Sequence, residues 1–130
     1  MTRRVYVLFL VLPLLAIFST SPAFAEIMMV KGKIMGASCV LNDTTCPTDL
    51  SDPRVSMERD FVLVAEDGST YFLTNMKRGA KQVLVSQDVE VIGKVRGDKM
   101  FVHNVEKMMM GGMVSVWNWD LRVRNLRHPR

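Results

Sequence analysis

The chain is rich in methionine, a residue whose side chain can bind metal ions: 11 of its 130 residues are methionine. Met108, Met109 and Met110 are consecutive, and Met113 follows after two glycines. Thioether sulfur is a soft ligand that suits Cu(I), so one candidate metal site combines Met108, Met110 and Met113 with His103. Methionines also serve as gap-filling core residues. Consecutive residues of an extended strand point to opposite faces, so at most two of the three neighbours can share a site. We therefore expect no tightly held Cu(I) and no cofactor.

The two cysteines, Cys39 and Cys46, enclose six residues and precede Pro47. Six intervening residues do not match the Cys-x-x-Cys spacing of redox motifs, in which one thiol pKa is depressed. A close, even pair of cysteines in an exported chain is typical of a disulfide. We expect a structural Cys39–Cys46 bridge, with a redox pair as the alternative.

Catalytic motifs are missing from the sequence. The two histidines are His103, within an expected strand, and His128, near the end of the chain. There is no Gly-x-Ser-x-Gly motif and no phosphate-binding glycine loop. We expect a protein that is not an enzyme.

The first 25 residues have the pattern of a secretory signal peptide. Arg3 and Arg4 precede an apolar run from Val5 to Phe18, and Ala23-Phe24-Ala25 has the small-x-small form of a cleavage site. An uncleaved membrane anchor is the alternative, but the run is shorter than the ~20 residues needed to span a bilayer. The arginine pair also partly fits a twin-arginine signal. All the export routes cross a membrane, and we expect a periplasmic or secreted protein with no remaining membrane span.

Charge is distributed unevenly along the chain. The formal net charge is +4, yet residues 26–121 carry 11 basic and 13 acidic residues. A body with negative net charge lacks the positive field that nucleic-acid binding requires. The remaining basic residues gather in a tail, 122–130, which could contact anionic lipid headgroups weakly. The expected domains are therefore a signal peptide (1–25), a folded body (26–121) and this tail.

Alternating apolar and polar residues predict strands over most of the body. The clearest is 88–96, in which Val89, Val91 and Val95 should face inward. Asp67-Gly68 suits a two-residue hairpin turn, because these residues tolerate positive φ. That turn predicts three cross-strand pairs: Val64 with Tyr71, Leu63 with Phe72, and Val62 with Leu73. Further expected elements are strands at 27–37, 99–107 and 113–119, a polar connection at 38–60, and a weak helix at 77–87.

The order strand, long loop, strand hairpin, helix, strand hairpin resembles the oligonucleotide/oligosaccharide-binding (OB) barrel, and in particular small exported bacterial OB-fold proteins. The segments that carry the resemblance are Val30–Ile34, Asp60–Leu73, Val89–Val95 and Val102–Lys107. The resemblance implies an all-β fold: a five-stranded, partly closed barrel with one short helix between the third and fourth strands. The cysteine-stapled first loop and the extra strand at 113–119 depart from that pattern.

Ligands of OB barrels meet the face of the second and third strands and the loops beside it. The resemblance therefore implies Arg59, Tyr71, Arg96 and Lys99 as ligand-surface residues, although a packed tyrosine and solvated charges are the ordinary alternative. Together these features predict a noncatalytic binding module in the periplasm, with an unidentified protein or small ligand as its partner. The alternative is a periplasmic methionine-rich carrier of Cu(I) or Ag(I).

We predict that the exported protein begins at Glu26 and holds a Cys39–Cys46 disulfide. Intact mass before and after reduction and alkylation measures both features. A mass that still includes residue 1 contradicts the cleavage, and two thiols that alkylate without reductant contradict the bridge.

Overall fold

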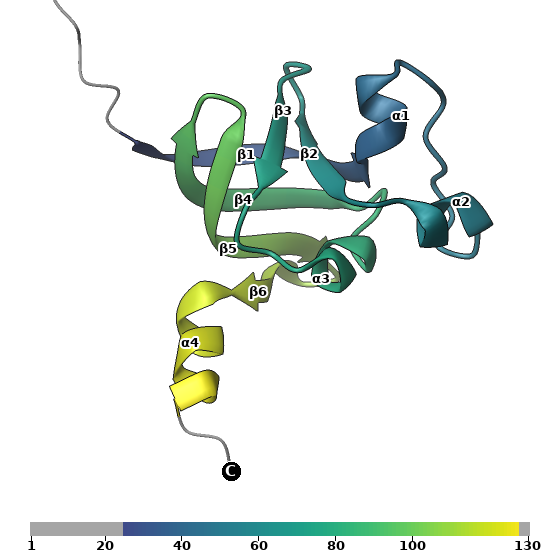
Figure 1. Ribbon diagram of the computed structural model, residues 1–130. Coiled ribbons are helices and arrows are strands. Elements are labelled where there is room, and N and C mark those ends of the chain that lie inside the picture. Colours follow the sequence, from purple (N-terminus) through teal and green to yellow (C-terminus); the bar gives the residue numbers. More distant parts are fainter. Residues whose placement is uncertain (1–24, 128–130) are drawn as a thin grey trace, which may run out of the picture.

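The computed structural model describes residues 25–127, so most of the expected signal segment and the last three tail residues lie outside the described part (Figure 1). The described residues form six strands: β1 (Glu26–Gly36), β2 (Phe61–Ala65), β3 (Thr70–Leu73), β4 (Asp88–Arg96), β5 (Lys99–Met109) and β6 (Gly112–Asn118). Four short helices accompany them: α1 (Ala37–Leu41), α2 (Pro53–Met57), α3 (Arg78–Gln82) and α4 (Trp119–Arg127).

Five of the strands close into a mixed barrel, which confirms the predicted all-β barrel fold. The sheet order is β3-β2-β1-β4-β5-β6, and a parallel pairing of β3 with β5 joins the two sides. Asn75 lengthens this seam, because its side-chain amide donates to the Val102 carbonyl at 2.7 Å and accepts from the Val102 N–H at 2.8 Å. With α3 between β3 and β4, the topology is OB-like. β6 lies outside the closed barrel and pairs only with β5.

Strand β1 belongs to both halves of the barrel. Residues 26–33 pair with β4 and residues 32–36 pair with β2, so the strand changes partners at Gly32 and Lys33. A Cβ on Gly32 would overlap the backbone of Val64 and Ala65. Glycine at this position therefore permits the close approach that lets one strand serve two neighbours.

Inward-facing side chains from all five barrel strands make the core. Val89 and Val91 are buried and Val95 packs against the core, as the alternation of β4 predicts. The fully buried residues of the barrel strands that belong to the core cluster are Ile34, Phe61, Leu63, Leu73, Val91, Met100, Val102 and Val105.

The predicted register of the β2–β3 hairpin is wrong by one residue. The observed pairs are Val64 with Thr70, Leu63 with Tyr71, and Val62 with Phe72. The Gly68 N–H donates to the Ala65 carbonyl, and the Ala65 N–H donates to the Ser69 carbonyl. Gly68 has φ +86°, so the connection is a three-residue loop whose last residue is in the left-handed region. The Ser69 N–H donates to the Asp67 carboxylate, which lowers the pKa of Asp67.

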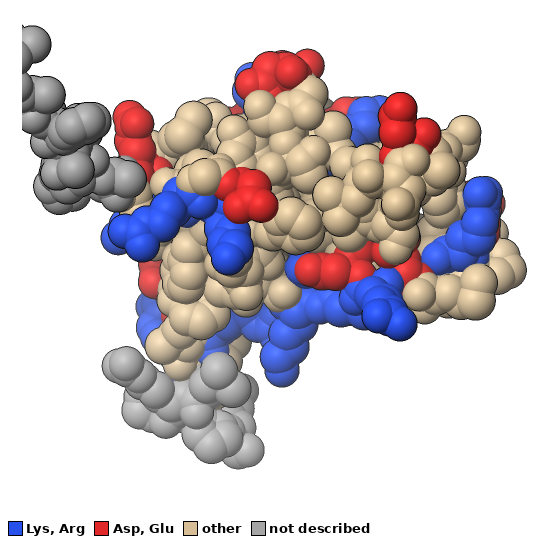
Figure 2. All heavy atoms as spheres, turned by 45° about the horizontal axis from the view of Figure 1, so that its top comes forward, with Lys and Arg blue, Asp and Glu red and all other residues tan. Residues whose placement is uncertain are grey.

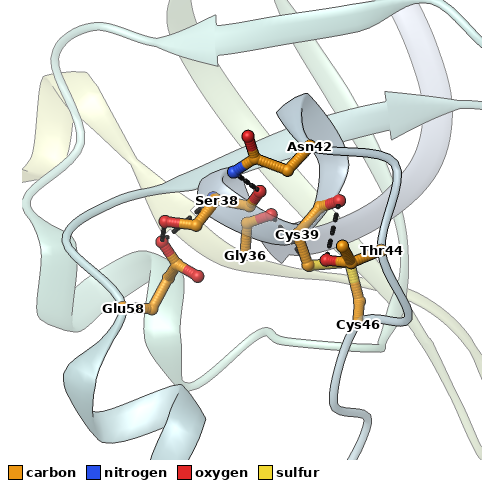
Figure 3. Close-up of a disulfide and its surroundings, with 7 residues drawn as sticks. All are labelled: Gly36, Ser38, Cys39, Asn42, Thr44, Cys46 and Glu58. Carbon is orange, nitrogen blue, oxygen red and sulfur yellow. Dashed lines mark hydrogen bonds between the residues drawn. A yellow bond between two sulfur atoms is a disulfide. The ribbon is translucent and has the colours of Figure 1, made fainter.

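The long connection from β1 to β2 is folded and stapled. Figure 3 shows the Cys39–Cys46 disulfide, which confirms the expected bridge, beside α1. The Ser38 hydroxyl donates to the Glu58 carboxylate at 2.7 Å and joins the two ends of the connection. Asp52 caps α2 by accepting from the Arg54 N–H, and hydrogen bonds from Arg54 lower the pKa of Asp52.

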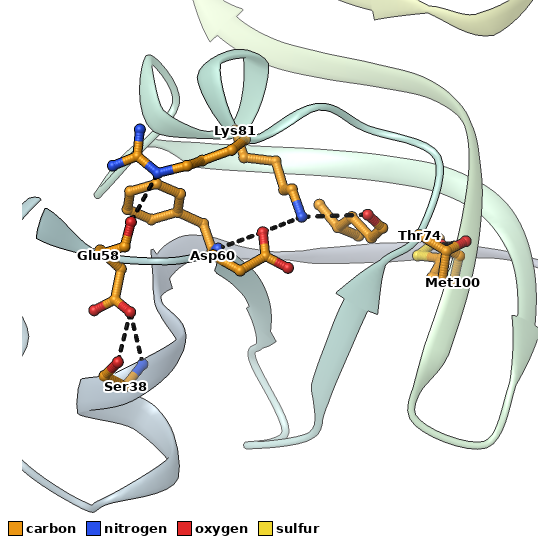
Figure 4. A network of polar contacts seen from close by, with 9 residues as sticks. Ser38, Glu58, Asp60, Thr74, Lys81 and Met100 are labelled. Carbon is orange, nitrogen blue, oxygen red and sulfur yellow. Dashed lines mark hydrogen bonds and ion pairs between the residues drawn. The ribbon is translucent and has the colours of Figure 1, made fainter. Parts of the chain in front are cut away.

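Helix α3 packs against the core through Ala80 and is shorter than the expected 77–87. Lys81 is buried, and its ammonium donates to the Asp60 carboxylate and to the Leu73 carbonyl (Figure 4). The Arg78 guanidinium lies over the Phe61 ring and donates to backbone carbonyls of Val55, Ser56 and Glu58. These two cations attach the connection and β2 to the helix.

The C-terminal end differs from expectation in its secondary structure. The last strand ends at Asn118, and the Asn118 side chain accepts a hydrogen bond from the Leu121 N–H at the start of α4. Basic residues of the expected tail, among them Arg122 and Arg124, lie on this helix. The sequence analysis placed no helix there.

We predict that Gly32→Ala lowers the melting temperature by roughly 10–15 °C, because the added methyl overpacks against backbone at a cost of about 2–3 kcal/mol. Gly79→Ala is the matched control, since a Cβ there meets nothing within 4 Å. In helix α3 this control should raise stability by about 0.5–1 kcal/mol. Thermal unfolding followed by circular dichroism measures both variants. Equal melting temperatures of the two variants would show that the close approach of β1 to β2 at Gly32 does not limit the stability of the fold.

Candidate functional site

A groove of about 470 Å³ lies on the outer surface of the barrel beside β1. Six apolar side chains line it: Met35 of β1, Val64 and Ala65 of β2, Val89 of β4, Met108 of β5 and Met113 of β6. Five charged residues also line it: Lys31, Lys33, Glu66, Asp88 and Glu90. We call this feature the methionine groove, with the apolar side chains as its floor and the charged residues as its rim.

Strand alternation explains why these methionines share one surface. Val30 and Ile34 of β1 face the core, so Met35 points outward with Lys31 and Lys33. Met108 and Met113 are directly opposite each other across the β5–β6 hairpin. Side chains of such a pair stand on the same face, about 4.5–5.5 Å apart at Cβ. Two distant segments of the chain therefore supply thioethers to one groove.

The rim carries both signs of charge. The Lys31 ammonium lies 3.7 Å from the Glu90 carboxylate, and the Lys33 ammonium lies 3.5 Å from the Asp88 carboxylate. The lysine side chains are 62% and 52% exposed, so each pair contributes little to stability. Figure 2 likewise shows acidic and basic residues on one face of the molecule with uncharged surface between them. A rim of mixed charge is a poor match for a polyanion such as a nucleic acid.

The four ligand-surface residues implied by the OB resemblance do not line the methionine groove. Arg59 is exposed just before β2, and Tyr71 packs against the core. Arg96 and Lys99 are exposed and pair with each other at the β4–β5 turn. The turn brings these two cations together near β3, because Lys99 also pairs with Phe72. Arg59 is not brought to that turn by any strand pairing.

The expected metal-site residues are divided by the structure. Met108 and Met113 meet in the groove, whereas Met110 is fully exposed at the hairpin turn. His103 is the extra residue of a bulge in β5, and its ring contacts Phe101 at a centroid distance of 5.6 Å. Among the described residues, no group of three or more His, Cys, Asp or Glu side chains is placed to hold a metal ion.

Aromatic side chains from β5, β6 and α4 form a separate cluster. Phe101 packs edge-on against Trp119 at 5.3 Å, and Trp119 lies 6.4 Å from Trp117. These contacts hold the start of α4 against β5. They give the tryptophans a packing role outside the groove.

Met35 is the groove methionine that the sequence analysis did not place in a candidate site. Its alternation with Ile34 marks it as outward-facing, and that signal was available. The alternation pattern does not reveal that β1 pairs with β4, β4 with β5 and β5 with β6. These pairings bring Met35 near Met108 and Met113, which are more than 70 positions away in the sequence.

Comparisons of the chain with protein-family models, with curated proteins and with solved structures found no match. None of the helices in residues 25–127 has the length and apolar character needed to cross a membrane. The OB-like assignment therefore rests on strand order and barrel closure alone.

Proposed function

We propose that this protein is an exported, noncatalytic OB-type binding module that holds an extended apolar segment of a partner protein in its methionine groove. The methionine groove carries the proposal, because it joins an apolar floor to a polar rim at a volume typical of ligand sites. The OB-type resemblance to small exported bacterial proteins supports the class.

Two observations support action in the periplasm or outside the cell. The N-terminal segment has the pattern of a signal peptide, and the Cys39–Cys46 disulfide is of the kind that persists in oxidising compartments. The partner would therefore be met after export.

The chemistry of the floor favours a peptide of apolar side chains. Methionine is unbranched and polarizable, so it adapts to irregular apolar shapes and is common at surfaces that accept varied partners. Met108 is 62% exposed and Met113 is 39% exposed, so part of each residue is accessible to a ligand. The paired lysines and carboxylates of the rim can receive backbone groups or charges of the same peptide.

Transport of Cu(I) is the second candidate function, and one observation favours it. Met35, Met108 and Met113 bring three thioethers to one groove, so Met35 takes the place of Met110, which is exposed at the hairpin turn. The same groove would then hold a soft metal ion as cargo.

We predict that octapeptides selected from a random display library carry apolar side chains at alternating positions. Met113→Glu should weaken their binding by at least about tenfold, because it places an unpaired carboxylate on the apolar floor. Met110→Glu is the matched control, since it puts the same charge on the same hairpin outside the groove. Fluorescence anisotropy measures the three affinities. Equal losses in both variants, or none in either, would refute the groove as the binding site.

We also predict that the protein does not hold Cu(I) against a competing chelator under mild reducing conditions. The test compares the wild type with a Met35/Met108/Met113→Leu variant and a Met110→Leu control. Leucine keeps the floor apolar, so the triple variant should still bind the selected octapeptides. One equivalent of copper that is lost only in the triple variant would instead establish the carrier function.

A further inference from the structure

Most methionines of this protein lie at its surface. Ten methionines fall within residues 25–127, and two of them, Met76 and Met100, are buried with exposed fractions of 5% and 0%. Seven others are exposed, from 39% at Met28 and Met113 to 104% at Met110. Methionine normally belongs to the residue types that proteins bury. Leucine or isoleucine would make a surface equally apolar, so the sulfur atoms add a reactivity that apolar character alone does not require.

Thioethers are the side chains of this protein that an oxidant meets first. Its two cysteines are joined in the Cys39–Cys46 disulfide, so no free thiol competes for the oxidant. Oxidation converts methionine to methionine sulfoxide, which replaces a flexible apolar side chain with a polar one and disrupts methionine-rich contact surfaces. The oxidant must reach the sulfur atom, so exposed methionines react before buried ones.

We propose that the methionine groove is a site of reversible methionine oxidation, and that sulfoxides on its floor switch off peptide binding. The inference rests on the proposed function, because it describes how the same groove is regulated. Met108 and Met113 stand opposite each other on one face of the β5–β6 hairpin, and Met35 of β1 lines the same groove. Oxidation of these three residues turns a large part of the apolar floor into polar surface.

A hydroperoxide is the oxidant class that balances this step. The thioether sulfur donates an electron pair to one peroxide oxygen, the O–O bond breaks and an S–O bond forms. With hydrogen peroxide, the leaving hydroxide takes the proton of the transferred oxygen and departs as water. Sulfur loses two electrons and the peroxide gains two. A dithiol reductase reverses the change: two thiols supply two electrons and two protons, the sulfoxide oxygen leaves as water, and the thiols become a disulfide.

The rim of the groove offers hydrogen-bond donors to the oxidised floor. Lys31 and Lys33 line the groove with Met35, and each ammonium carries three N–H donors beside one carboxylate partner. Lys33 and Met35 are two positions apart on β1, so their side chains stand on the same face of the strand. A sulfoxide oxygen on Met35 adds an acceptor to that face. Oxidation therefore also draws rim donors away from a bound peptide.

The first test maps the sites of oxidation. After limited treatment of the exported protein with hydrogen peroxide, peptide mass spectrometry should find sulfoxide at Met108 and Met110 while Met76 and Met100 remain unmodified, as their exposed fractions predict. The circular dichroism spectrum should not change, since the core methionines keep their thioethers. Sulfoxide that forms at Met100 as fast as at Met108 overturns the proposal.

The second test measures binding of the selected octapeptides by fluorescence anisotropy before and after peroxide treatment. Oxidation should weaken binding to the wild type by at least about tenfold, because each sulfoxide places a polar group against apolar peptide side chains. Methionine sulfoxide reductases should restore the affinity. The Met35/Met108/Met113→Leu variant should bind equally before and after treatment. Met110→Leu is the matched control, and it should lose affinity on oxidation as the wild type does.

The outcomes separate this proposal from the proposed function. Unchanged affinity of a wild type with mapped sulfoxides at Met108 and Met113 overturns the regulation alone, and so does an equal loss of affinity in the triple leucine variant. Absence of octapeptide binding before oxidation refutes the proposed function, and the regulation falls with it.

Discussion

The backbone contact between Gly32 and strand β2 is the constraint on which the barrel depends. A strand of 11 residues must pair with β4 along its first part and with β2 along its last part, and the two pairings overlap only at Gly32 and Lys33. No side chain fits between β1 and Val64 at the overlap. Gly93 of β4 makes a similar close approach to the Phe101 carbonyl. Two positions without a Cβ thus allow the sheet to curl far enough for β3 to reach β5.

Closure of the barrel also creates the groove to which we assign function. Once β3 pairs with β5, strand β6 has no place in the barrel and remains on the outside of β5. The end of the hairpin then carries Met108 and Met113 past the last residue of β5 paired with β4, next to Met35 of β1. The methionine groove and the open edge of β6 are therefore two consequences of one extra strand.

The first connection is held to the barrel mainly by cations of α3. Arg78 donates to the Val55 and Ser56 carbonyls in the last turn of α2, and Lys81 is buried against Asp60. Only the lysine of this pair is buried, because the Asp60 side chain is 43% exposed, so loss of Asp60 would leave a buried charge behind. The disulfide and the Ser38–Glu58 hydrogen bond close the same connection from its other side. The long polar connection is therefore ordered, although few of its residues belong to the core.

The sequence by itself determined the class of the fold, the limits of β4 and the disulfide. These features follow from local signals: alternation reports which side of a strand is buried, glycines mark turns, and the cysteine spacing indicates a disulfide. The hairpin register failed because Gly68 serves a three-residue loop, a choice that depends on how β2 and β3 pack rather than on Asp67-Gly68. The groove was decided only by tertiary structure: Met35 and Met113 are neighbours because strand pairings connect β1 to β6 through β4 and β5. A local sequence pattern cannot predict these successive strand pairings. Each pairing depends on the closure of a long loop and on which strand becomes its neighbour when the sheet bends into a barrel.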